Sequence, residues 1–170
     1  ITGHSADLLT VDIRATKPHK VIVSGQDFEV QVYKGVPFKP EKSIQKVHAS
    51  FINKCAFTKS DDGAHFITVS SDKAVRVHDS ESYECVVEKE GAHAQGITDF
   101  TLTSNADEFV TCSSDRTARI HRIDYENKAI QQINELILSD FDTAGLKENV
   151  EKQQLGVLFD QLDSELMAVG

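Results

Sequence analysis

The sequence predicts an all-β fold assembled from a repeated unit, and three observations indicate it. Short stretches in which apolar, β-branched residues alternate with polar ones recur along the chain, most clearly at 66–79. Turn-forming aspartates recur at positions 27, 72 and 115, which are 45 and then 43 residues apart. Each aspartate follows a histidine by 22 to 24 residues, at positions 4, 48 and 93. A constant offset inside a period near 44 is the signature of a repeat architecture.

Each repeat centres on two strands and a tight turn. In the stretch 66–79 the turn is Ser70-Ser71-Asp72-Lys73, because short Ser and Asp side chains bond back to nearby backbone. The same pattern occupies 21–33 and 109–121. Six residues after each turn aspartate comes a ring: Tyr33, His78 and His121.

These intervals, with Gly3-His4 and His78-Asp79, resemble the WD-repeat family, whose signature is Gly-His, then Asp, then Trp-Asp in about 40–45 residues. The resemblance implies that each His, Asp and ring, linked by a Ser or Thr of the second strand (Thr68 or Ser70, Thr111 or Ser113), forms a buried structural network. Its members are His4, Asp27, Tyr33, His48, Asp72, His78, His93, Asp115 and His121. The rival interpretation, a catalytic triad, fails because a triad occurs once and this pattern occurs three times.

The sequence departs from the family because it contains no tryptophan. Tyr33, His78 and His121 stand at the tryptophan positions. Histidine buries less apolar area than indole, so we expect these units to be less stable than consensus repeats.

The predicted fold is a WD-repeat β-propeller, specifically a partial arc of about three and a half four-stranded blades. We expect blades at 1–45, 46–88 and 89–133, a long acidic connector at 134–152, and the two inner strands of a fourth blade at 153–170. Two interpretations of the connector stay open, a functional or disordered loop and a short amphipathic helix.

Three repeats and part of a fourth do not close a ring, so we expect the chain to be a piece of a larger protein. The open arc leaves blade faces uncovered. Either neighbouring segments of the parent protein cover them, or the chain associates with a second copy of itself through its open blade edges.

Charge and composition exclude several classes of function. The formal charge is −9, and residues from Asp124 onward, with 10 acidic and 3 basic, supply −7 of it. The sequence contains no basic patch that would favour binding to nucleic acid. It also contains no run of 18 apolar residues that could span a membrane. We expect Cys55, Cys85 and Cys112 to be free thiols, without a zinc site, in a reducing cytosol. No catalytic constellation or phosphate loop occurs, so we expect neither an enzyme nor a cofactor.

A narrower resemblance, to the actin-interacting protein 1 family, extends over nearly the whole chain. It is carried by Ile1-Thr2-Gly3-His4-Ser5, Val11-Asp12-Ile13 with Pro18, Ser24-Gly25-x-Asp27, Gly35-Val36-Pro37-Phe38-Lys39, His48 with Phe51-Ile52-Asn53, Gly91-Ala92-His93-x-x-Gly96-Ile97, and Gln153-Gln154-Leu155-Gly156. The Pro-Phe-Lys loop and the Gln-Gln-Leu-Gly stretch matter most, since a generic repeat requires neither.

That resemblance implies two joined seven-bladed propellers, with this chain in the first, N-terminal one. It also implies a cytoplasmic protein that binds actin filaments with cofilin (actin-depolymerising factor) and speeds filament disassembly. The residues expected to contact actin or cofilin are Phe51, Phe38, Asp27 and Lys39. Gln26 and Pro40 stand where the family has an acidic residue and a second aromatic.

Three alternatives stay open. Phe51 is either a partner contact or a plug between blades, and Phe38 either meets a partner or is tucked against its own blade. The rival function is a generic WD-repeat scaffold that assembles another protein complex. A more distant rival is an enzyme in another part of the parent chain.

Overall fold

The computed structural model describes residues 4–59, 62–105, 107–137, 156–159 and 166–169. The described residues form β-strands joined by turns, and they are all-β as the sequence predicts. Within these ranges no helix is long and apolar enough to span a bilayer.

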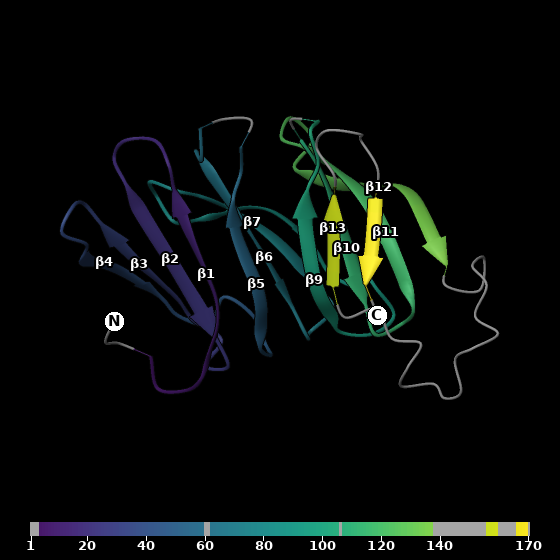
Figure 1. Cartoon of the computed structure of the whole chain (residues 1–170), viewed down its shortest axis with the longest axis horizontal. Helices are drawn as coiled ribbons and strands as arrows, with labels where there is room; N and C mark the ends of the chain where they lie inside the picture. Colours follow the sequence, from purple (N-terminus) through teal and green to yellow (C-terminus); the bar gives the residue numbers. More distant parts are fainter. Residues whose placement is uncertain (1–3, 60–61, 106, 138–155, 160–165, 170) are drawn as a thin grey trace.

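Three four-stranded antiparallel sheets stand side by side along an arc (Figure 1), and each is called a blade below. In every blade the strands follow chain order, with the first strand innermost. Blade 1 holds β1 (Leu8–Arg14), β2 (Lys20–Gly25), β3 (Val30–Lys34) and β4 (Lys39–Ile44). Blade 2 holds β5 (Ile52–Phe57), β6 (His65–Ser70), β7 (Val75–Asp79) and β8 (Cys85–Lys89). Blade 3 holds β9 (Ile97–Leu102), β10 (Glu108–Ser113), β11 (Thr117–Asp124) and β12 (Ala129–Ile137). A hairpin of β13 (Gly156–Phe159) and β14 (Leu166–Val169) contacts β9 and β10.

The second strand of each blade is the most buried, because a blade packs on both faces. Successive side chains of β6 point to opposite faces, so Phe66 packs toward blade 1 while Ile67 packs toward blade 3. A strand that is buried on both faces has a continuous run of apolar residues in its sequence, and Val21-Ile22-Val23 is such a run in β2. The outermost strand β4 is largely exposed, which explains its Lys-Pro-Glu-Lys composition.

Gly25 shows how tightly the inner strands approach. A Cβ on this residue would lie 2.1 Å from the carbonyl oxygen of Asp7, which accepts a hydrogen bond from the Gln26 amide. Register pairs Gly25 with Leu8, Ser70 with Ile52, and Ser113 with Ile97. Blades 2 and 3 therefore tolerate a serine at the position where blade 1 requires glycine.

The two ends of each blade carry different turns and loops. The aspartate end, toward the bottom of Figure 1, carries the turns between second and third strands and the loops between blades. There, the Val47 amide donates to the Phe28 carbonyl and the Ser71 amide donates to the Phe51 carbonyl. The opposite end carries the remaining turns, and there the Gly35 amide donates to the His19 carbonyl.

Apolar side chains fill both seams between neighbouring blades. The seam between blades 1 and 2 contains Ile22, Val30, Val32, Val47, Ile52, Cys55, Phe57 and Phe66. The seam between blades 2 and 3 is built mainly from Ile67, Val69, Val75, Val77 and Val87 against Ile97, Phe100 and Phe109. Phe57 and Phe66 meet edge to face, with ring centroids 6.1 Å apart, the geometry that aromatic pairs favour.

A buried cation adds a second tie between blades 1 and 2. Lys20 of β2 is fully buried, and its Nζ donates to the Ser80 carbonyl and to Tyr83 Oη at 2.9 Å. The same Nζ lies 3.1 Å from a carboxylate oxygen of Glu81. Tyr83 Oη in turn donates to Glu41 Oε2 at 2.6 Å. Burying an ammonium group is tolerable only because blade 2 supplies these acceptors.

The next seam uses different chemistry at the corresponding position. Lys20 pairs with Lys34 across β2 and β3, as His65 pairs with Asp79 across β6 and β7. Instead of a cation, blade 2 therefore presents His65, whose ring lies 4.7 Å from the Tyr125 ring of blade 3. The two seams are not interchangeable, although the blades share one topology.

Blade 1 leaves one apolar face open. The register places Leu8, Val11 and Ile13 of β1 where Ile52, Cys55 and Phe57 stand in β5. The β5 residues are buried in the seam with the preceding blade, whereas the β1 residues are 46%, 59% and 57% exposed. That neighbouring segments or a second copy cover this face stays a prediction.

The outer strand of blade 3 is longer than the sequence predicted. We expected a connector from residue 134, but β12 pairs with β11 as far as Ile137. Residues 134–137 are therefore strand, because Glu135 and Leu136 continue the ladder opposite Arg119 and Ala118. The rest of the expected connector, and the choice between loop and helix, lies outside the described residues.

Replacing Lys20 tests the buried tie. Lys20→Met keeps the side-chain volume but strips a donor from Ser80, Tyr83 and Glu81, so we expect the free energy of unfolding to fall by about 3 kcal/mol. The matched control is Lys34→Met, which removes a 43% exposed cation that pairs with Glu41 and should cost under about 0.5 kcal/mol. Urea unfolding of both variants measures the difference, and equal costs would contradict the assigned role of Lys20.

Candidate functional site

The turn aspartate of blade 2 sits in a complete hydrogen-bond network. His48 Nδ1 lies 3.0 Å from the Asp72 carboxylate, and His48 Nε2 lies 2.8 Å from Thr68 Oγ1. The amides of Ala49 and Ala74 donate to the same carboxylate at 2.9 and 3.0 Å. Thr68, rather than Ser70, is the hydroxyl that links the second strand to the histidine. A buried carboxylate needs several donors, and this arrangement supplies them.

Blade 3 repeats the arrangement with two additions. His93 Nδ1 lies 3.0 Å from the Asp115 carboxylate and His93 Nε2 lies 2.8 Å from Thr111 Oγ1. The Thr117 hydroxyl also donates to Asp115 at 2.7 Å. His121 joins this network through its Nε2, 3.0 Å from Thr111 Oγ1.

Blade 1 carries an incomplete version. His4 Nδ1 lies 2.7 Å from Asp27 Oδ2, which also accepts from the Ser5 amide. Four residues before the aspartate, where the other blades have Thr68 and Thr111, blade 1 has Val23. Among the described residues, His4 Nε2 and Asp27 Oδ1 consequently have no hydrogen-bond partner, although both atoms are buried.

The three rings that replace tryptophan behave differently from one another. His78 stacks on Phe66 at 4.9 Å, and neither of its nitrogens has a hydrogen-bond partner in the described part of the chain. His121 stacks on Phe109 at 5.1 Å in addition to its bond with Thr111. Tyr33 packs among Val21 and Val23. The rings are therefore mainly cross-strand packing partners, since each faces its register partner on the second strand.

The networks of blades 2 and 3 favour the ionised form of their turn carboxylates. Burial alone would raise the pKa of Asp72, but the hydrogen bonds from His48 and the Ala49 and Ala74 amides outweigh it and lower that pKa well below its usual range. The pKa of Asp115 is lowered in the same way, with Thr117 as the largest opposing donor to burial. These bonds favour the charged form, so they favour the folded turn at neutral pH.

The two stacked histidines are held neutral. Burial lowers the pKa of His78 to about 3, and the nearby His48 and Arg76 act in the same direction. Burial likewise lowers the pKa of His121 to about 3, assisted by Lys89 and His93. A neutral imidazole stacked on phenylalanine suits an apolar seam, whereas an imidazolium would be costly there.

Sequence reasoning missed two arginines that complete the networks. Arg76 Nη1 donates to the Val47 carbonyl at 2.6 Å, and its Nε donates to Glu88 at 3.1 Å. Arg119 does the same with Ala92 and Glu135. The repeat spacing in the sequence could have revealed them, because an arginine follows both Asp72 and Asp115 by four residues. In blade 1 the equivalent residue is Gln31.

The surface residues predicted to meet a partner do not form one patch. Phe51 lies at the aspartate end and its side chain is 43% exposed. Phe38 is also 43% exposed, but it lies in the turn from β3 to β4 at the opposite end, where Lys39 begins β4. A strand separates the two ends by roughly 15–20 Å.

The sequence assigned Asp27 both to the buried network and to the partner surface. Its side chain is only 5% exposed and its Oδ2 is bonded to His4, which agrees with the network role. A contact of Asp27 with a partner stays a prediction.

Phe28 is a surface residue that the sequence reasoning did not single out. It follows Asp27 directly, with a backbone φ of 65°, and its ring centroid lies 5.9 Å from that of Phe51. The two rings come from different segments, the turn of blade 1 and the loop into blade 2. Their pairing was hidden in the sequence because 23 positions separate 28 from 51.

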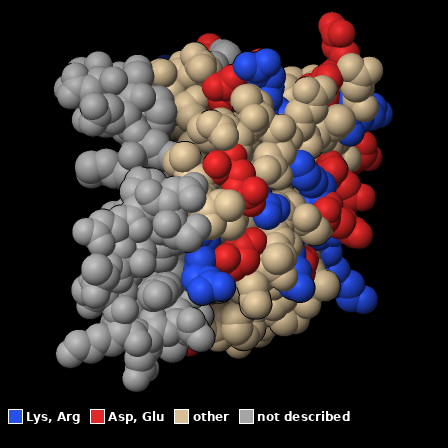
Figure 2. Space-filling view, turned by 90° about the vertical axis from the view of Figure 1, so that its right-hand side faces the viewer, with Lys and Arg blue, Asp and Glu red and all other residues tan. Residues whose placement is uncertain are grey.

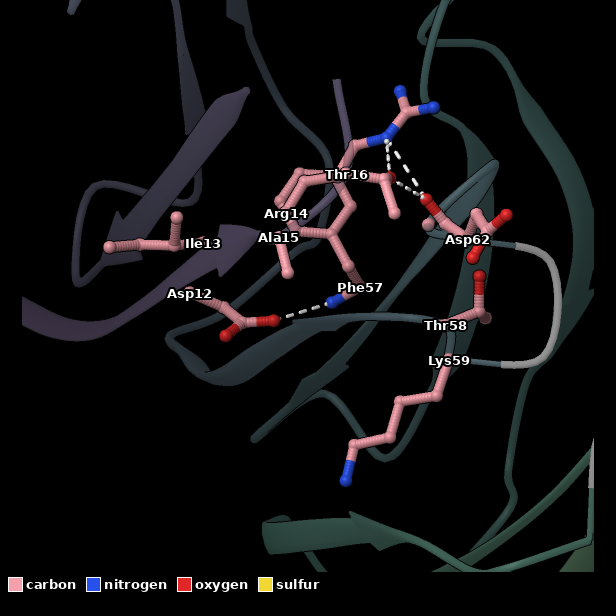
Figure 3. A pocket seen from close by; sticks show the side chains of 10 residues that line it. Asp12, Ile13, Arg14, Ala15, Thr16, Phe57, Thr58, Lys59 and Asp62 are labelled. Atoms are coloured by element: carbon pink, nitrogen blue, oxygen red, sulfur yellow. Dashed lines mark hydrogen bonds between the residues drawn. The ribbon is translucent and has the colours of Figure 1, made fainter. Parts of the chain in front are cut away.

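A pocket of about 260 Å³ opens between β1 and β5 at the opposite end (Figure 3). Its polar groups bond to one another: Asp12 accepts from the Phe57 amide, and Arg14 donates to Thr16 and to the Asp62 carbonyl. The pocket is therefore part of the seam between blades. In the described ranges no group of three or more His, Cys, Asp or Glu side chains is arranged to hold a metal ion.

On the face seen in Figure 2, Lys and Arg side chains lie among Asp and Glu, without a broad region of one sign. Ion pairs between neighbouring strands include Arg76 with Glu88 and Arg119 with Glu135.

Comparison with known proteins identifies the repeat. The model of the WD domain, G-beta repeat, matches residues 39–79 and 84–122. The chain contains WD repeats. The first match covers β4 to β7 and the second begins one residue before β8 and ends in β11. A WD repeat in the sequence thus starts with the outer strand of one blade and continues into three strands of the next, which links neighbouring blades covalently.

Relatives of known name are similar to about half of the chain. Actin-interacting protein 1-2 of Arabidopsis thaliana is 40% identical over 86 residues, which is 51% of this chain and 14% of that protein. The 66 kDa stress protein of Physarum polycephalum is 37% identical over 100 residues, and WD repeat-containing protein 1 of Mus musculus is 33% identical over 99. Both matches cover 57% of this chain and 16% of the relative, so the chain matches only a small part of these proteins.

The solved WD40 β-propeller domain of Doa1 has the same fold. It superposes with a TM-score of 0.74 over 98% of this chain and 48% of that chain. At 18% identity, this likeness concerns the blade architecture alone.

Two opposite substitutions test the difference between the networks of blades 1 and 2. Val23→Thr should give His4 Nε2 the hydroxyl partner that it lacks and raise the free energy of unfolding by about 1 kcal/mol. The mirror variant Thr68→Val strips the partner of His48 and should cost about 1–3 kcal/mol. Urea unfolding curves of the two variants measure both effects, and a destabilising Val23→Thr would contradict the proposed equivalence of the blades.

The neutral histidines predict acid sensitivity. The folded pKa of His78 and His121 is about 3, below the ordinary value of 6.5, so the unfolded chain binds more protons between these two pH values. The stability that each neutral histidine contributes is therefore fully present above pH 6.5. It is lost as the pH falls below 6.5, by about 1.4 kcal/mol per pH unit for each histidine. Urea unfolding at pH 7 and pH 5 should differ by about 2 kcal/mol per histidine.

His78→Phe supplies the control for acid sensitivity, because phenylalanine retains the stack on Phe66 and cannot be protonated. This variant should lose about half of the histidine contribution to the pH dependence. A pH profile identical to that of the wild type would show that His78 is not the titrating group.

Proposed function

We propose that this chain belongs to an actin-binding WD-repeat protein that promotes disassembly of cofilin-decorated actin filaments. The observation that carries the proposal is the 40% identity with Actin-interacting protein 1-2 of Arabidopsis thaliana. Actin-interacting protein 1 of Drosophila melanogaster, 30% identical over 98 residues, supports it independently. The partners are actin filaments and cofilin, in the cytoplasm and its actin cytoskeleton.

The geometry of the aspartate end supports this function. Binding residues are often carried by loops on a rigid scaffold. Phe51 stands on such a loop, between His48 of the buried network and the inner strand β5. The Ser71 amide donates to its carbonyl, so the loop is also tied to the neighbouring turn. An exposed aromatic side chain on a fixed backbone has the character of an interface anchor.

The mechanism requires differential binding and no chemical step. A protein that favours cofilin-decorated filaments must bind them more tightly than bare filaments, and a coupling of about 1–3 kcal/mol is typical for such linkage. Tight binding to the decorated state stabilises the distortion that precedes breakage. The blades supply rigid loops for this purpose, and the role is not enzymatic.

The alternative is a scaffold for a different protein complex. The observation that favours it is the separation of Phe38 and Lys39 from Phe51, because these residues form a second exposed feature at the opposite end. The changes at Gln26 and Pro40 point in the same direction.

Co-sedimentation with actin filaments tests the proposal. The full-length protein should pellet with cofilin-decorated filaments more than with bare filaments, and Phe51→Ala should weaken this binding by about tenfold, the effect of losing a moderate interface anchor. Phe38→Ala is the matched control, since this ring is equally exposed at the opposite end.

The outcomes separate the two functions. If Phe38→Ala weakens binding and Phe51→Ala does not, the actin surface lies at the opposite end. If the wild type ignores filaments with and without cofilin, the scaffold function replaces the proposed one.

A further inference from the structure

The three turn aspartates are each followed by a residue in the left-handed region. Phe28, Lys73 and Arg116 have φ values of 65°, 74° and 70° at equivalent positions of blades 1, 2 and 3. Two of these residues are long, basic and exposed. Only blade 1 places an aromatic side chain there.

An aromatic residue is a costly choice at such a position. Left-handed backbone favours glycine, asparagine and aspartate, and it disfavours bulky side chains. Core burial does not explain the choice, because Phe28 is only partly buried and is not a member of the apolar clusters between blades. Its ring instead meets Phe51, which is itself 43% exposed.

The fold holds the two rings together without help from their side chains. The Val47 amide donates to the Phe28 carbonyl, and the Ser71 amide donates to the Phe51 carbonyl. Both backbones are therefore fixed before any partner arrives. Rigid aromatic groups bind at a low cost in conformational entropy, which makes a pre-formed pair a good anchor.

The charges around the pair indicate the chemistry of the partner. Lys46, Lys73 and Arg116 are exposed and lie on turns or loops of the same end. The turn aspartates beside them are buried in their networks, with side chains 12% exposed at Asp72 and 6% at Asp115. Exposed acidic side chains at this end include Asp7, whose carbonyl accepts from the Gln26 amide, and Glu90, which lies 3.7 Å from Arg76. An acidic protein surface that carries an apolar side chain fits this arrangement.

We propose that Phe28 and Phe51 form one aromatic anchor that binds an apolar side chain on the acidic surface of the decorated actin filament, and that Lys73 and Arg116 add electrostatic attraction. This inference rests on the proposed function and deepens it. It assigns a contact role to Phe28, and it explains why a bulky residue is kept at a position where the backbone disfavours it.

The test compares Phe28→Asn with Arg116→Asn. Asparagine suits the left-handed backbone, so neither change should lower the melting temperature of the full-length protein. Phe28→Asn should weaken co-sedimentation with cofilin-decorated filaments by about tenfold, at low and at high salt alike. Arg116→Asn should weaken it by less than about threefold, and only at low salt, because exposed charge attraction is screened.

A double variant completes the design. If the rings act as one anchor, Phe28→Asn combined with Phe51→Ala should be little weaker than either change alone, whereas independent contacts would multiply their effects. Filament binding that is unchanged in Phe28→Asn, beside a wild type that pellets, would overturn the inference and leave the proposed function intact. A clearly lower melting temperature of Phe28→Asn would also overturn it, because Phe28 would then be a structural residue. A wild type that does not pellet would overturn the proposed function itself.

Discussion

The rest of the structure depends on a carboxylate buried in each turn between the second and third strands. A charged group that leaves water must be met by donors, and in blade 2 Asp72 is met by His48 and by two backbone amides. Because His48 lies on the loop that leaves blade 1, the same bonds fix how the chain enters blade 2. Arg76 strengthens this connection through the Val47 carbonyl. One polar cluster thus sets both the turn within a blade and the path between blades.

The seams show how a repeated fold becomes specific. All three blades share strand order and apolar packing, yet the position of Lys20 in one seam is taken by His65 in the next. A fully buried ammonium accepts few alternative neighbours, since every donor must find an acceptor. The His65 imidazole, tilted against the Tyr125 ring at a centroid distance of 4.7 Å, instead requires an aromatic neighbour. Such differences favour one order of blades over shuffled arrangements, which apolar contacts alone do not distinguish.

The buried networks and the exposed turn residues meet at the aspartate end. The turns that bury Asp72 and Asp115 also project Lys73 and Arg116 into solvent, so the network supports the surface directly. Blade 1 differs in both respects, because its network lacks the threonine link and its turn carries Phe28. The least complete network therefore underlies the most distinctive surface feature. This combination is consistent with recognition residues chosen at some expense of local stability.

Sequence alone determined the repeat and the all-β class, because these depend on local alternation and on a fixed period near 44 residues. The resemblance to the WD-repeat family implied the pairing of each histidine with its aspartate. It also placed the threonines among the candidates for the link. Only the tertiary structure showed that β12 runs to Ile137, that the Asp27 carboxylate is enclosed, and that Phe38 and Phe51 lie at opposite ends. The pairing of Phe28 with Phe51 and the burial of Lys20 were likewise decided there. Both depend on contacts between separate blades, and the pattern within one repeat carries no information about which side chains a neighbouring blade will present.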